Sequence, residues 1–395
     1  AVIVQPELAE TLDHLELAQH RRIVLGEDYE ALLDTASPEF PDIDVDPEDG
    51  LVILYTSGTT GLPKGALISH RAMVARAMCG AAELEIPIGD NFCAWPPFYH
   101  MASTDQALGT LMRGGTVHVV DGYDPERLIE ILEREEMRFF ILMPGMVGQF
   151  AAILEGRNVQ VKGVGICGAM PDLVPREDIA YVTRILNAPY ANTFGATETG
   201  LPPATSSPLP IGVVPTSLSK RQSAFCELRL VDPDDNDVPI GTPGEAALRG
   251  PTLFSGYWNA PQTNAHDFRN GWFHMGDVLR RNSDGTLDYV DRVKYMIKSG
   301  GENIYPAEIE QVLASDERVQ EAVVVRRTDR RWGEVPVAFV VPSQPGLNEE
   351  ALLALCREHL SSYKRPKDIF LIADEELPRS TTGKVQRHAL EARLT

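Results

Sequence analysis

Positive charge is scarce in this sequence. Its 395 residues include 36 lysines and arginines against 57 aspartates and glutamates, which gives a formal net charge of −21. Nucleic acids and anionic membrane surfaces would repel so acidic a chain, which argues against both as partners. Whatever positive charge a ligand needs must then be concentrated at a site.

Long hydrophobic runs are also missing. The longest notable run, Phe139 to Val147, is interrupted by Pro144 and Gly145. It falls well short of the roughly 20 apolar residues that a membrane-spanning helix needs. The first residues, Ala1-Val-Ile-Val4, turn polar at once, which does not indicate a secretory signal. We therefore expect no membrane span.

Cysteine is sparse and forms no motif. The five cysteines are scattered, odd in number and contain no Cys-x-x-Cys pair; they are Cys79, Cys93, Cys167, Cys226 and Cys356. Neither a disulfide framework nor a zinc site is expected from this pattern. It is typical of a reducing compartment, so we expect a cytoplasmic protein.

The order of sequence patterns predicts an α/β protein with more than one domain. A chain of this length is too long for one ordinary core. Residues 1–37 predict a strand, a helix and a strand, and the acidic, proline-rich residues 38–50 predict a loop. Predicted strands then alternate with predicted helices: strands at 51–54, 92–95, 116–120 and 139–143, helices at 71–85 and 125–136. This alternation favours parallel or mixed sheets covered by helices.

The pattern changes after Cys226. Short alternating strands at 227–231 and 245–249, separated by turns, predict a β-barrel-like part over about 212–292. A new series of helices and strands follows and predicts a small α+β domain over 294–395. The large domain would then span residues 1–293.

The most informative motif is Tyr55-Thr-Ser-Gly-Thr-Thr-Gly-Leu-Pro-Lys-Gly65. It brings three glycines, four serine and threonine hydroxyls and Lys64 together directly after a predicted strand. Backbone N–H groups and hydroxyls in such a loop can turn toward an anion, while the lysine adds positive charge. It is not the Walker P-loop, because Lys64 lies between Pro63 and Gly65. The loop predicts a triphosphate site and so points to ATP.

Six further motifs follow along the chain. They are Pro96-Pro-Phe-Tyr-His100, Cys167-Gly-Ala-Met-Pro171, Asn192-Thr-Phe-Gly-Ala-Thr-Glu198, Gly271-Trp-Phe-His-Met-Gly-Asp277, Asp291 to Pro306, and Pro378-Arg-Ser-Thr-Thr-Gly-Lys384-Val-Gln-Arg387. A single carboxylate after a glycine turn, such as Asp277, can accept hydrogen bonds from both hydroxyls of a ribose. Paired glycines, as at Gly300 and Gly301, let backbone lie close to a thin ligand.

In this order the motifs resemble the signatures of the adenylate-forming superfamily, which contains acyl-CoA synthetases, aryl-CoA ligases, luciferases and the adenylation domains of peptide synthetases. The resemblance is closest to acyl- or aryl-CoA ligases and covers nearly all of the chain. It implies a large N-terminal domain of helix-covered sheets with a barrel-like part. A small mobile C-terminal domain would follow, turning about a hinge at Lys294.

The resemblance implies an ATP site with three parts. The β- and γ-phosphates would lie against Thr56, Ser57, Gly58, Thr59, Thr60, Gly61 and Lys64. Adenine and the α-phosphate would be held by Gly168, Ala169, Asn192, Phe194, Gly195 and Thr197, with Phe194 in place of the usual tyrosine. Asp277 and Arg292 would hold the ribose, and Glu198 would bind Mg²⁺, which commonly takes one or two carboxylates alongside phosphate oxygens.

The resemblance also assigns catalysis and the second substrate. Lys384 would be the main catalytic residue, reaching across the domain interface to stabilise charge that grows in the transition state. His100 would line the route between the acyl pocket and the tunnel for the pantetheine arm of coenzyme A. That arm would lie against Lys298, Ser299, Gly300 and Gly301.

The reaction implied is ATP-dependent ligation of a carboxylic acid to coenzyme A. The acid would first join AMP with release of pyrophosphate, and the small domain would then turn to admit CoA. The acyl pocket would be lined by Phe98, Tyr99, Met143, Met146, Val147, Ala169 and Met170. These apolar residues suit an aliphatic or aryl acid, as in fatty acid metabolism. No buried cation is obvious that would pair a second carboxylate.

Other readings of the same motifs stay open. The acceptor could be a carrier-protein thiol, the enzyme could be a luciferase-like oxygenase, or the chain could bind nucleotide without catalysis. A homodimer is a further possibility. Members of the superfamily usually place about a hundred more residues, one small domain, before the phosphate loop, whereas 54 residues precede Tyr55 here. We expect the start of the family fold to be absent or supplied by a partner chain.

Overall fold

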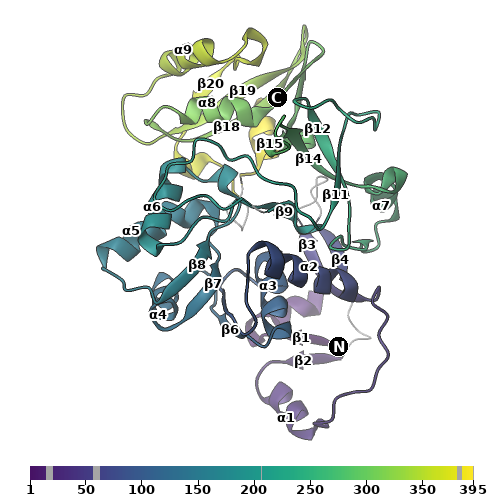
Figure 1. Cartoon of the computed structure of the whole chain (residues 1–395). Coiled ribbons are helices and arrows are strands. Elements are labelled where there is room, and N and C mark those ends of the chain that lie inside the picture. Colours follow the sequence, from purple (N-terminus) through teal and green to yellow (C-terminus); the bar gives the residue numbers. More distant parts are fainter. Residues whose placement is uncertain (15–20, 57–62, 206, 380–384, 395) are drawn as a thin grey trace. The chain divides into compact units, whose positions relative to one another are not determined.

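The computed structural model describes residues 1–14, 21–56, 63–205, 207–379 and 385–394 (Figure 1). These residues form two compact units, Ala1–Asp46 and Pro47–Thr395. Across the described residues, no helix combines the length and apolar character that crossing a membrane requires.

The first unit is small and has little interior. Strands β1 (Val2–Val4) and β2 (Arg22–Val24) pair in parallel, and helix α1 (Glu27–Thr35) follows β2. Both predicted strands are therefore confirmed. The predicted helix before β2 is instead two short 3₁₀ turns, Pro6–Leu8 and Glu10–His14, in its described part. The structure adds α1, which the sequence patterns did not predict.

The second unit begins with an antiparallel hairpin of β3 (Gly50–Thr56) and β4 (Lys64–Ser69). The short strand β13 (Gly256–Tyr257) pairs with the other edge of β4 and completes a three-stranded sheet. The predicted strand at 51–54 is confirmed, and of its four residues only Leu54 is buried. Successive side chains of a strand point to opposite faces, and only one face of this sheet packs on the core.

Helices cover parallel strand pairs in the next part of the chain. Strand β5 (Asn91–Ala94) pairs with β6 (Thr116–Val119), and β7 (Glu136–Phe140) pairs with β8 (Gly163–Cys167), both in parallel. The helices are α2 (His70–Glu83), α3 (Met101–Met112), α4 (Pro125–Arg134), α5 (Val147–Gly156) and α6 (Arg176–Leu186). Figure 1 shows α4, α5 and α6 beside β7 and β8. The predicted α/β class is confirmed, although β7 lies three residues before its predicted start.

Antiparallel strands follow. Strands β9 (Phe194–Ala196) and β10 (Gly200–Ala204) form a hairpin, and helix α7 spans Pro261–Asp267. A four-stranded sheet has the order β11 (Glu227–Val231), β12 (Pro243–Arg249), β14 (Phe273–Arg281) and β15 (Leu287–Arg292). This order is open at both ends among the described strands. The barrel-like part is thus an open sheet.

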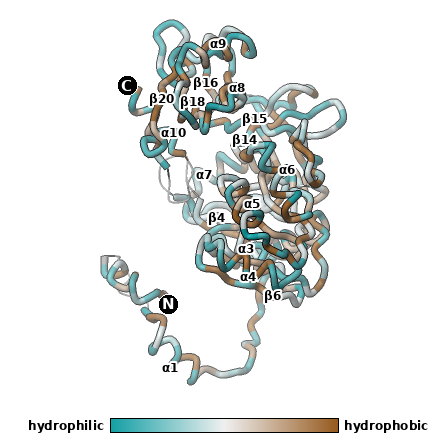
Figure 2. The backbone as a smooth tube through the Cα atoms, turned by 90° about the vertical axis from the view of Figure 1, so that its left-hand side faces the viewer, coloured by the Kyte–Doolittle hydropathy of each residue, from teal (hydrophilic) through white to brown (hydrophobic). Residues whose placement is uncertain are grey.

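The last hundred residues form an α+β arrangement, as predicted. The strands are β16 (Ile297–Ser299), β17 (Glu302–Ile304), β18 (Val319–Asp329), β19 (Gly333–Pro342) and β20 (Ile369–Leu371). The helices are α8 (Pro306–Ala314), α9 (Glu349–His359) and α10 (Arg387–Glu391). Ile309, Val340 and Leu352 meet in a core of their own. Figure 2 shows hydrophobic stretches in β20 and hydrophilic residues around α9.

A buried ion pair between Lys220 and Asp172 joins two segments of the second unit that are far apart in the sequence. The side chain of Lys220 is 1% exposed, and its Nζ lies 2.6 Å from Oδ2 of Asp172. Lys220 also donates to the carbonyl oxygen of Leu218 at 2.9 Å. A buried ammonium is tolerated only with such partners, because an unpaired charge in a low-dielectric interior is costly.

We therefore expect Asp172→Ala to lower the free energy of unfolding by about 3–5 kcal/mol, because it leaves the Lys220 charge buried and unpaired. The double variant Asp172→Leu/Lys220→Met should recover most of that loss. Denaturant unfolding measures both. Glu130→Ala, which breaks the exposed pair with Arg127, is the matched control and should change stability by about 0.5 kcal/mol or less. A loss under about 1 kcal/mol for Asp172→Ala would contradict this account.

Candidate functional site

The β3–β4 hairpin fixes the two described ends of the predicted phosphate loop. Thr56 is the last residue of β3 and Lys64 the first of β4, and the two are register partners. The predicted loop residues Ser57, Gly58, Thr59, Thr60 and Gly61 lie outside the described residues. Nζ of Lys64 lies 4.9 Å from the centroid of the Tyr257 ring. An aromatic face at this distance attracts an ammonium through the ring quadrupole.

Glu198 contacts the same tyrosine as Lys64. The hydroxyl of Tyr257 donates a hydrogen bond to Oε1 of Glu198 at 2.7 Å. The backbone N–H of Phe254 donates to the Glu198 carbonyl oxygen at 2.9 Å. Burial, and then the neighbouring Glu198 carboxylate, raise the pKa of the Tyr257 phenol. Tyr257 thus stays protonated and is a hydrogen-bond donor to the predicted magnesium ligand.

Residues Thr252 to Trp258 connect these two features, and we call them the clamp segment. Besides the contacts of Phe254 and Tyr257, the N–H of Trp258 donates to the carbonyl oxygen of Gly65 at 2.7 Å. Sequence reasoning missed this segment entirely. Its one signal is the aromatic-rich Phe254-Ser-Gly-Tyr-Trp258, which by itself predicts only a strand or turn.

Arg76 anchors Thr197 from the other side. Its side chain is 2% exposed, and its guanidinium pairs with Asp105 of α3 at 3.2 Å. It donates to the carbonyl oxygens of Thr197 and Thr252, both at 2.9 Å. One arginine on α2 therefore links the Thr197-Glu198 turn to the clamp segment. The sequence reading also missed Arg76, which lies on the apolar face of α2 beside Ala72, Met73 and Cys79.

The predicted adenine turn is built on tight backbone packing. Gly168 has a φ of 78°, and a Cβ there would lie 2.2 Å from the Tyr190 ring, so glycine is required. The Tyr190 hydroxyl donates to the carbonyl oxygen of Ala169 at 3.0 Å. Met170 adopts a left-handed conformation, with a φ of 48°. A bulky residue in this region is unusual and is held there by its surroundings.

The Asn192 to Glu198 motif runs into the β9–β10 hairpin. The side-chain amide of Asn192 is buried and donates to the carbonyl oxygen of Ser219 at 3.0 Å. Phe194 is buried against Tyr289, with ring centroids 4.8 Å apart. A Cβ at Gly195 would lie 2.0 Å from the Gly200 carbonyl oxygen, so this glycine permits the hairpin to close. Phe194 and Gly195 therefore have packing roles that are independent of any nucleotide.

Asp277 is the most deeply buried carboxylate of the predicted site, with a 1% exposed side chain. Nε of Arg292 lies 2.9 Å from its Oδ1. Burial raises the pKa of Asp277 to about 6, with Glu198 adding to the rise and Arg292 opposing it. A carboxylate offers about four acceptor positions, and one guanidinium does not fill them. Arg292 forms this ion pair from a more exposed position, with a 43% exposed side chain.

The predicted acyl-pocket residues differ widely in exposure. Val147 is fully buried in the core, Met143 and Met146 are partly buried beside it, and Tyr99 is 68% exposed. Phe98 is exposed as well. His100 precedes α3, and its Nδ1 accepts a hydrogen bond from the N–H of Ala102 at 3.1 Å. The imidazole therefore caps the helix, a role that sequence reasoning did not assign to it.

The predicted CoA residues form a tight two-residue turn. Lys298 and Ser299 lie on β16, and Gly300 and Gly301, with φ values of 59° and 90°, lead into β17. Positive φ at both positions is what such a hairpin demands, and glycine supplies it at little cost. The predicted turn is present in the structure; its contact with CoA remains a prediction.

Of the two lysines that were assigned roles in the C-terminal region, the structure describes Lys294 but not Lys384. Lys294 lies in a 3₁₀ turn, Val293–Tyr295, and its carbonyl oxygen accepts a hydrogen bond from Arg326 at 3.0 Å. Its Nζ lies 4.8 Å from the Tyr295 ring centroid. Lys384 lies outside the described residues. Both roles remain predictions.

The charged side chains at the predicted site suit Mg²⁺ bound together with phosphates better than they suit a metal ion bound by protein side chains alone. Within the described part of the chain, no three histidine, cysteine, aspartate or glutamate side chains are grouped to hold a metal ion. Mg²⁺ is often held by one or two carboxylates, waters and substrate phosphates. Glu198 could supply the one carboxylate of such a site, and Lys64, which contacts the same Tyr257, could bind the phosphates.

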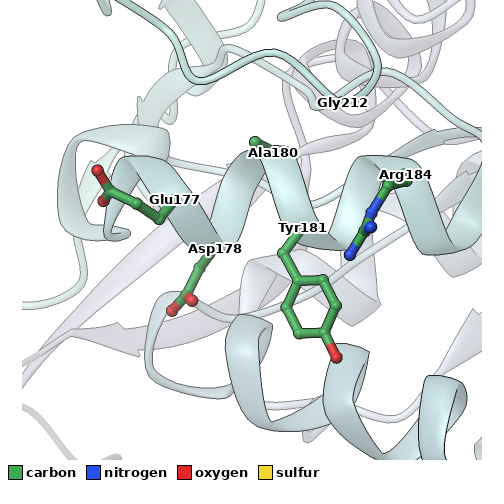
Figure 3. Close-up of a pocket in the computed structure, with 6 residues that line it drawn as sticks. All are labelled: Glu177, Asp178, Ala180, Tyr181, Arg184 and Gly212. Atoms are coloured by element: carbon green, nitrogen blue, oxygen red, sulfur yellow. The ribbon is translucent and has the colours of Figure 1, made fainter.

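A separate open hollow of about 480 Å³ lies along α6 (Figure 3). It is lined by Glu177, Asp178, Ala180, Tyr181, Arg184 and Gly212. Tyr181 donates to Glu155 at 2.7 Å and lies under the Arg184 guanidinium, 5.5 Å from the ring centroid. None of the predicted site residues that the structure describes lines this hollow.

The raised pKa of Asp277 predicts a pH-dependent nucleoside site. Below about pH 6 the carboxylate takes up a proton and accepts ribose hydroxyls less well. Adenosine affinity should therefore fall as the pH is lowered through about 6, since neutral adenosine has no group that titrates there. Calorimetric titration between about pH 5 and 8 measures it.

Asp277→Asn is the control for this titration and should bind adenosine weakly at every pH. The same substitution tests stability. Because the folded pKa exceeds the unfolded value of 3.8, the ionised carboxylate costs stability as the pH rises from about 4 to 6. Asp277→Asn should remove that loss. Wild-type adenosine binding that does not change with pH would contradict the assignment.

Known proteins are similar to this chain over most of its length. A family model for AMP-binding enzymes matches residues 1–258, and a model for the C-terminal domain of AMP-binding enzymes matches residues 308–384. Feruloyl-CoA synthase from Amycolatopsis sp is 33% identical over all of this chain and 79% of its own length. Indoleacetate–CoA ligase from Aromatoleum aromaticum is 34% identical over 91% of this chain and 70% of its own length.

A solved structure is similar throughout. O-succinylbenzoate coenzyme A synthetase from Bacillus subtilis, in complex with ATP and a magnesium ion, superimposes with a TM-score of 0.79 at 26% identity. The match covers 98% of this chain and 78% of that one. The prediction of an adenylate-forming enzyme on the side of the acid–CoA ligases is therefore confirmed, and this chain belongs to the family of AMP-binding enzymes.

Proposed function

We propose that this chain uses ATP to join an aromatic carboxylic acid to coenzyme A. The observation that carries the proposal is the meeting of Lys64 and Glu198 at Tyr257. A cation of the kind that binds phosphates and a carboxylate of the kind that binds magnesium thus both contact one fixed side chain. The similarity to acid–CoA ligases over the whole chain supports the same reaction.

The first step forms the acyl adenylate. A carboxylate oxygen of the acid attacks the α-phosphorus of ATP, the bond to the bridging oxygen of the β-phosphate breaks, and pyrophosphate leaves. Lys64, Thr56 and the loop hydroxyls Ser57, Thr59 and Thr60 hold the β- and γ-phosphates, and Thr197 holds the α-phosphate. When bound at Glu198, Mg²⁺ neutralises phosphate charge. Asp277 and Arg292 hold the ribose, and Lys384 stabilises the negative charge at the reacting phosphorus.

The second step transfers the acyl group. The thiolate of CoA attacks the acyl carbon, and AMP leaves with the electron pair of the C–O bond. The small domain turns about Lys294 so that the turn at Gly300 and Gly301 replaces Lys384 at the site. The pantetheine arm passes these glycines and His100 to reach the acyl adenylate.

The proposed acid substrate has an aromatic ring and one carboxylate, with no second carboxylate that would need a cation of the protein. Ferulate and indoleacetate, after which two relatives are named, have an aromatic ring. The apolar Met143, Met146 and Met170, with Ala169, suit such a ring. Among the described residues, the buried cations Arg76 and Lys220 are each paired with a carboxylate of the chain itself. Neither offers a free charge to a second substrate carboxylate.

We also propose a cytoplasmic homodimer. Four of the five cysteines are buried as thiols, which suits a reducing compartment. Exposed apolar residues on the outer faces of two helices, Val74 and Met78 of α2 with Leu111 and Met112 of α3, support self-association. Light scattering of the purified chain tests the dimer.

The reaction is tested by pyrophosphate release with MgATP across aromatic and aliphatic acids, with and without CoA. Lys384→Ala should lower adenylate formation at least about 10²- to 10³-fold, because it removes one preorganised charge-stabilising group. Thioester formation from supplied acyl adenylate should persist. Lys162→Ala, an exposed lysine bonded to the carbonyl of Arg134, is the control and should leave both steps unchanged.

Two results would contradict this proposal. One is equal loss of both half-reactions in a folded Lys384→Ala variant. The other is the absence of pyrophosphate release with any acid. If the thioester forms with a carrier-protein thiol and not with CoA, the acceptor of the acyl group is a carrier protein.

A further inference from the structure

We infer that Tyr257 is a positioning residue that couples the magnesium site to the phosphate site. Its hydroxyl orients Glu198 toward the metal, and its ring holds the Lys64 ammonium. The inference rests on the proposed function, in which Glu198 and Lys64 bind magnesium and phosphate. It assigns the coupling between them to one side chain that the motif analysis did not include.

The side chain is fixed on several sides. Tyr257 is 8% exposed and packs edge to face on Phe254, with centroids 4.9 Å apart. Its backbone N–H donates to Oδ1 of Asn264 at 2.7 Å, and its carbonyl oxygen accepts from Nδ2 of the same residue at 2.9 Å. It also pairs with Ala66 of β4. Its backbone and ring are therefore set before any ligand arrives.

The hydroxyl acts on Glu198. A carboxylate that accepts one strong hydrogen bond through Oε1 has a restricted orientation. Among the described residues no hydrogen bond is made to Oε2, the oxygen that we assign to the metal. Groups that orient a ligating side chain typically change metal affinity about 10- to 100-fold when removed. The 2.7 Å distance and the buried, protonated phenol are what such a role requires.

The ring acts on Lys64. The ammonium lies 4.9 Å from the ring centroid, and Lys64 is the described residue at the C-terminal end of the predicted phosphate loop. Lys64 is only partly buried, so the aromatic face limits its freedom without neutralising its charge. Among the described residues Lys64 forms no ion pair with a carboxylate, unlike the buried cations Arg76 and Lys220.

Two substitutions separate these contributions. Tyr257→Phe removes the hydroxyl and keeps the ring. Tyr257→Leu removes both. The experiment is calorimetric titration of the full chain with ATP, once with Mg²⁺ and once with EDTA, without acid or CoA. The ratio of the two affinities measures the contribution of magnesium and does not require catalysis.

The matched control is Tyr181→Phe. Tyr181 also donates to a carboxylate at 2.7 Å and lies under a cation, but it lines the hollow along α6 (Figure 3). Its substitution should leave both ATP affinities unchanged. Glu198→Gln is the reference and should remove most of the enhancement by magnesium.

We expect Tyr257→Phe to lower the enhancement by magnesium roughly tenfold, with ATP affinity in EDTA unchanged. Tyr257→Leu should in addition weaken ATP binding in EDTA roughly fivefold. An unchanged enhancement in Tyr257→Phe would overturn the inference, and so would an equal loss with and without magnesium, which is what loosened folding produces. If Glu198→Gln itself keeps the full enhancement, the metal assignment of the proposed function fails instead.

Discussion

The site depends on one short stretch of backbone, the clamp segment Thr252–Trp258. Its N–H groups at Phe254 and Trp258 bind the carbonyl oxygens of Glu198 and Gly65, residues separated by more than a hundred positions in the chain. These hydrogen bonds fix the turn that contains the predicted magnesium ligand Glu198 relative to the β3–β4 hairpin. Backbone bonds of this kind lose little freedom on ligand binding, since they are already formed, and preorganisation is the main source of electrostatic catalysis.

Arg76 secures the other side of the same arrangement. It binds the carbonyl oxygens of Thr197 and Thr252 while Asp105 balances its charge. A buried guanidinium without that carboxylate would be costly, and the two carbonyls alone would not compensate. In the described part of the chain the buried cations Arg76 and Lys220 are thus paired with carboxylates of the chain itself, whereas Lys64 and Lys294 lie against aromatic rings.

Much of this could be predicted from the sequence. The paired glycines at 300 and 301 have a local cause, because both adopt the positive φ that a two-residue turn requires. The need for glycine at position 168 comes instead from the Tyr190 ring, a contact made only in the fold. Alternating patterns also located strands such as β11 and β12. The β7 strand was misplaced because residues 141–142 are as buried as the strand itself, and burial alone does not distinguish a strand from the coil that follows.

Other features could not be predicted because they depend on contacts between distant segments. The capping role of His100, the ion pair of Arg292 with Asp277, and the partners of Arg76 all arise only when the chain is folded. Tyr257 is the clearest case. In the sequence it is one aromatic residue in a strand-like stretch. Its role is indicated only by its contacts in the fold, with Glu198 through the hydroxyl and with Lys64 through the ring.

The most direct measurement is a crystal structure of the chain with ATP and Mg²⁺. Our account predicts that Glu198 reaches the metal at about 2.0–2.1 Å while its other oxygen still accepts the Tyr257 hydroxyl, and that Lys64 binds phosphate while lying over the same ring. A metal held by Glu198 with Tyr257 turned away, or phosphates bound away from Lys64, would contradict it.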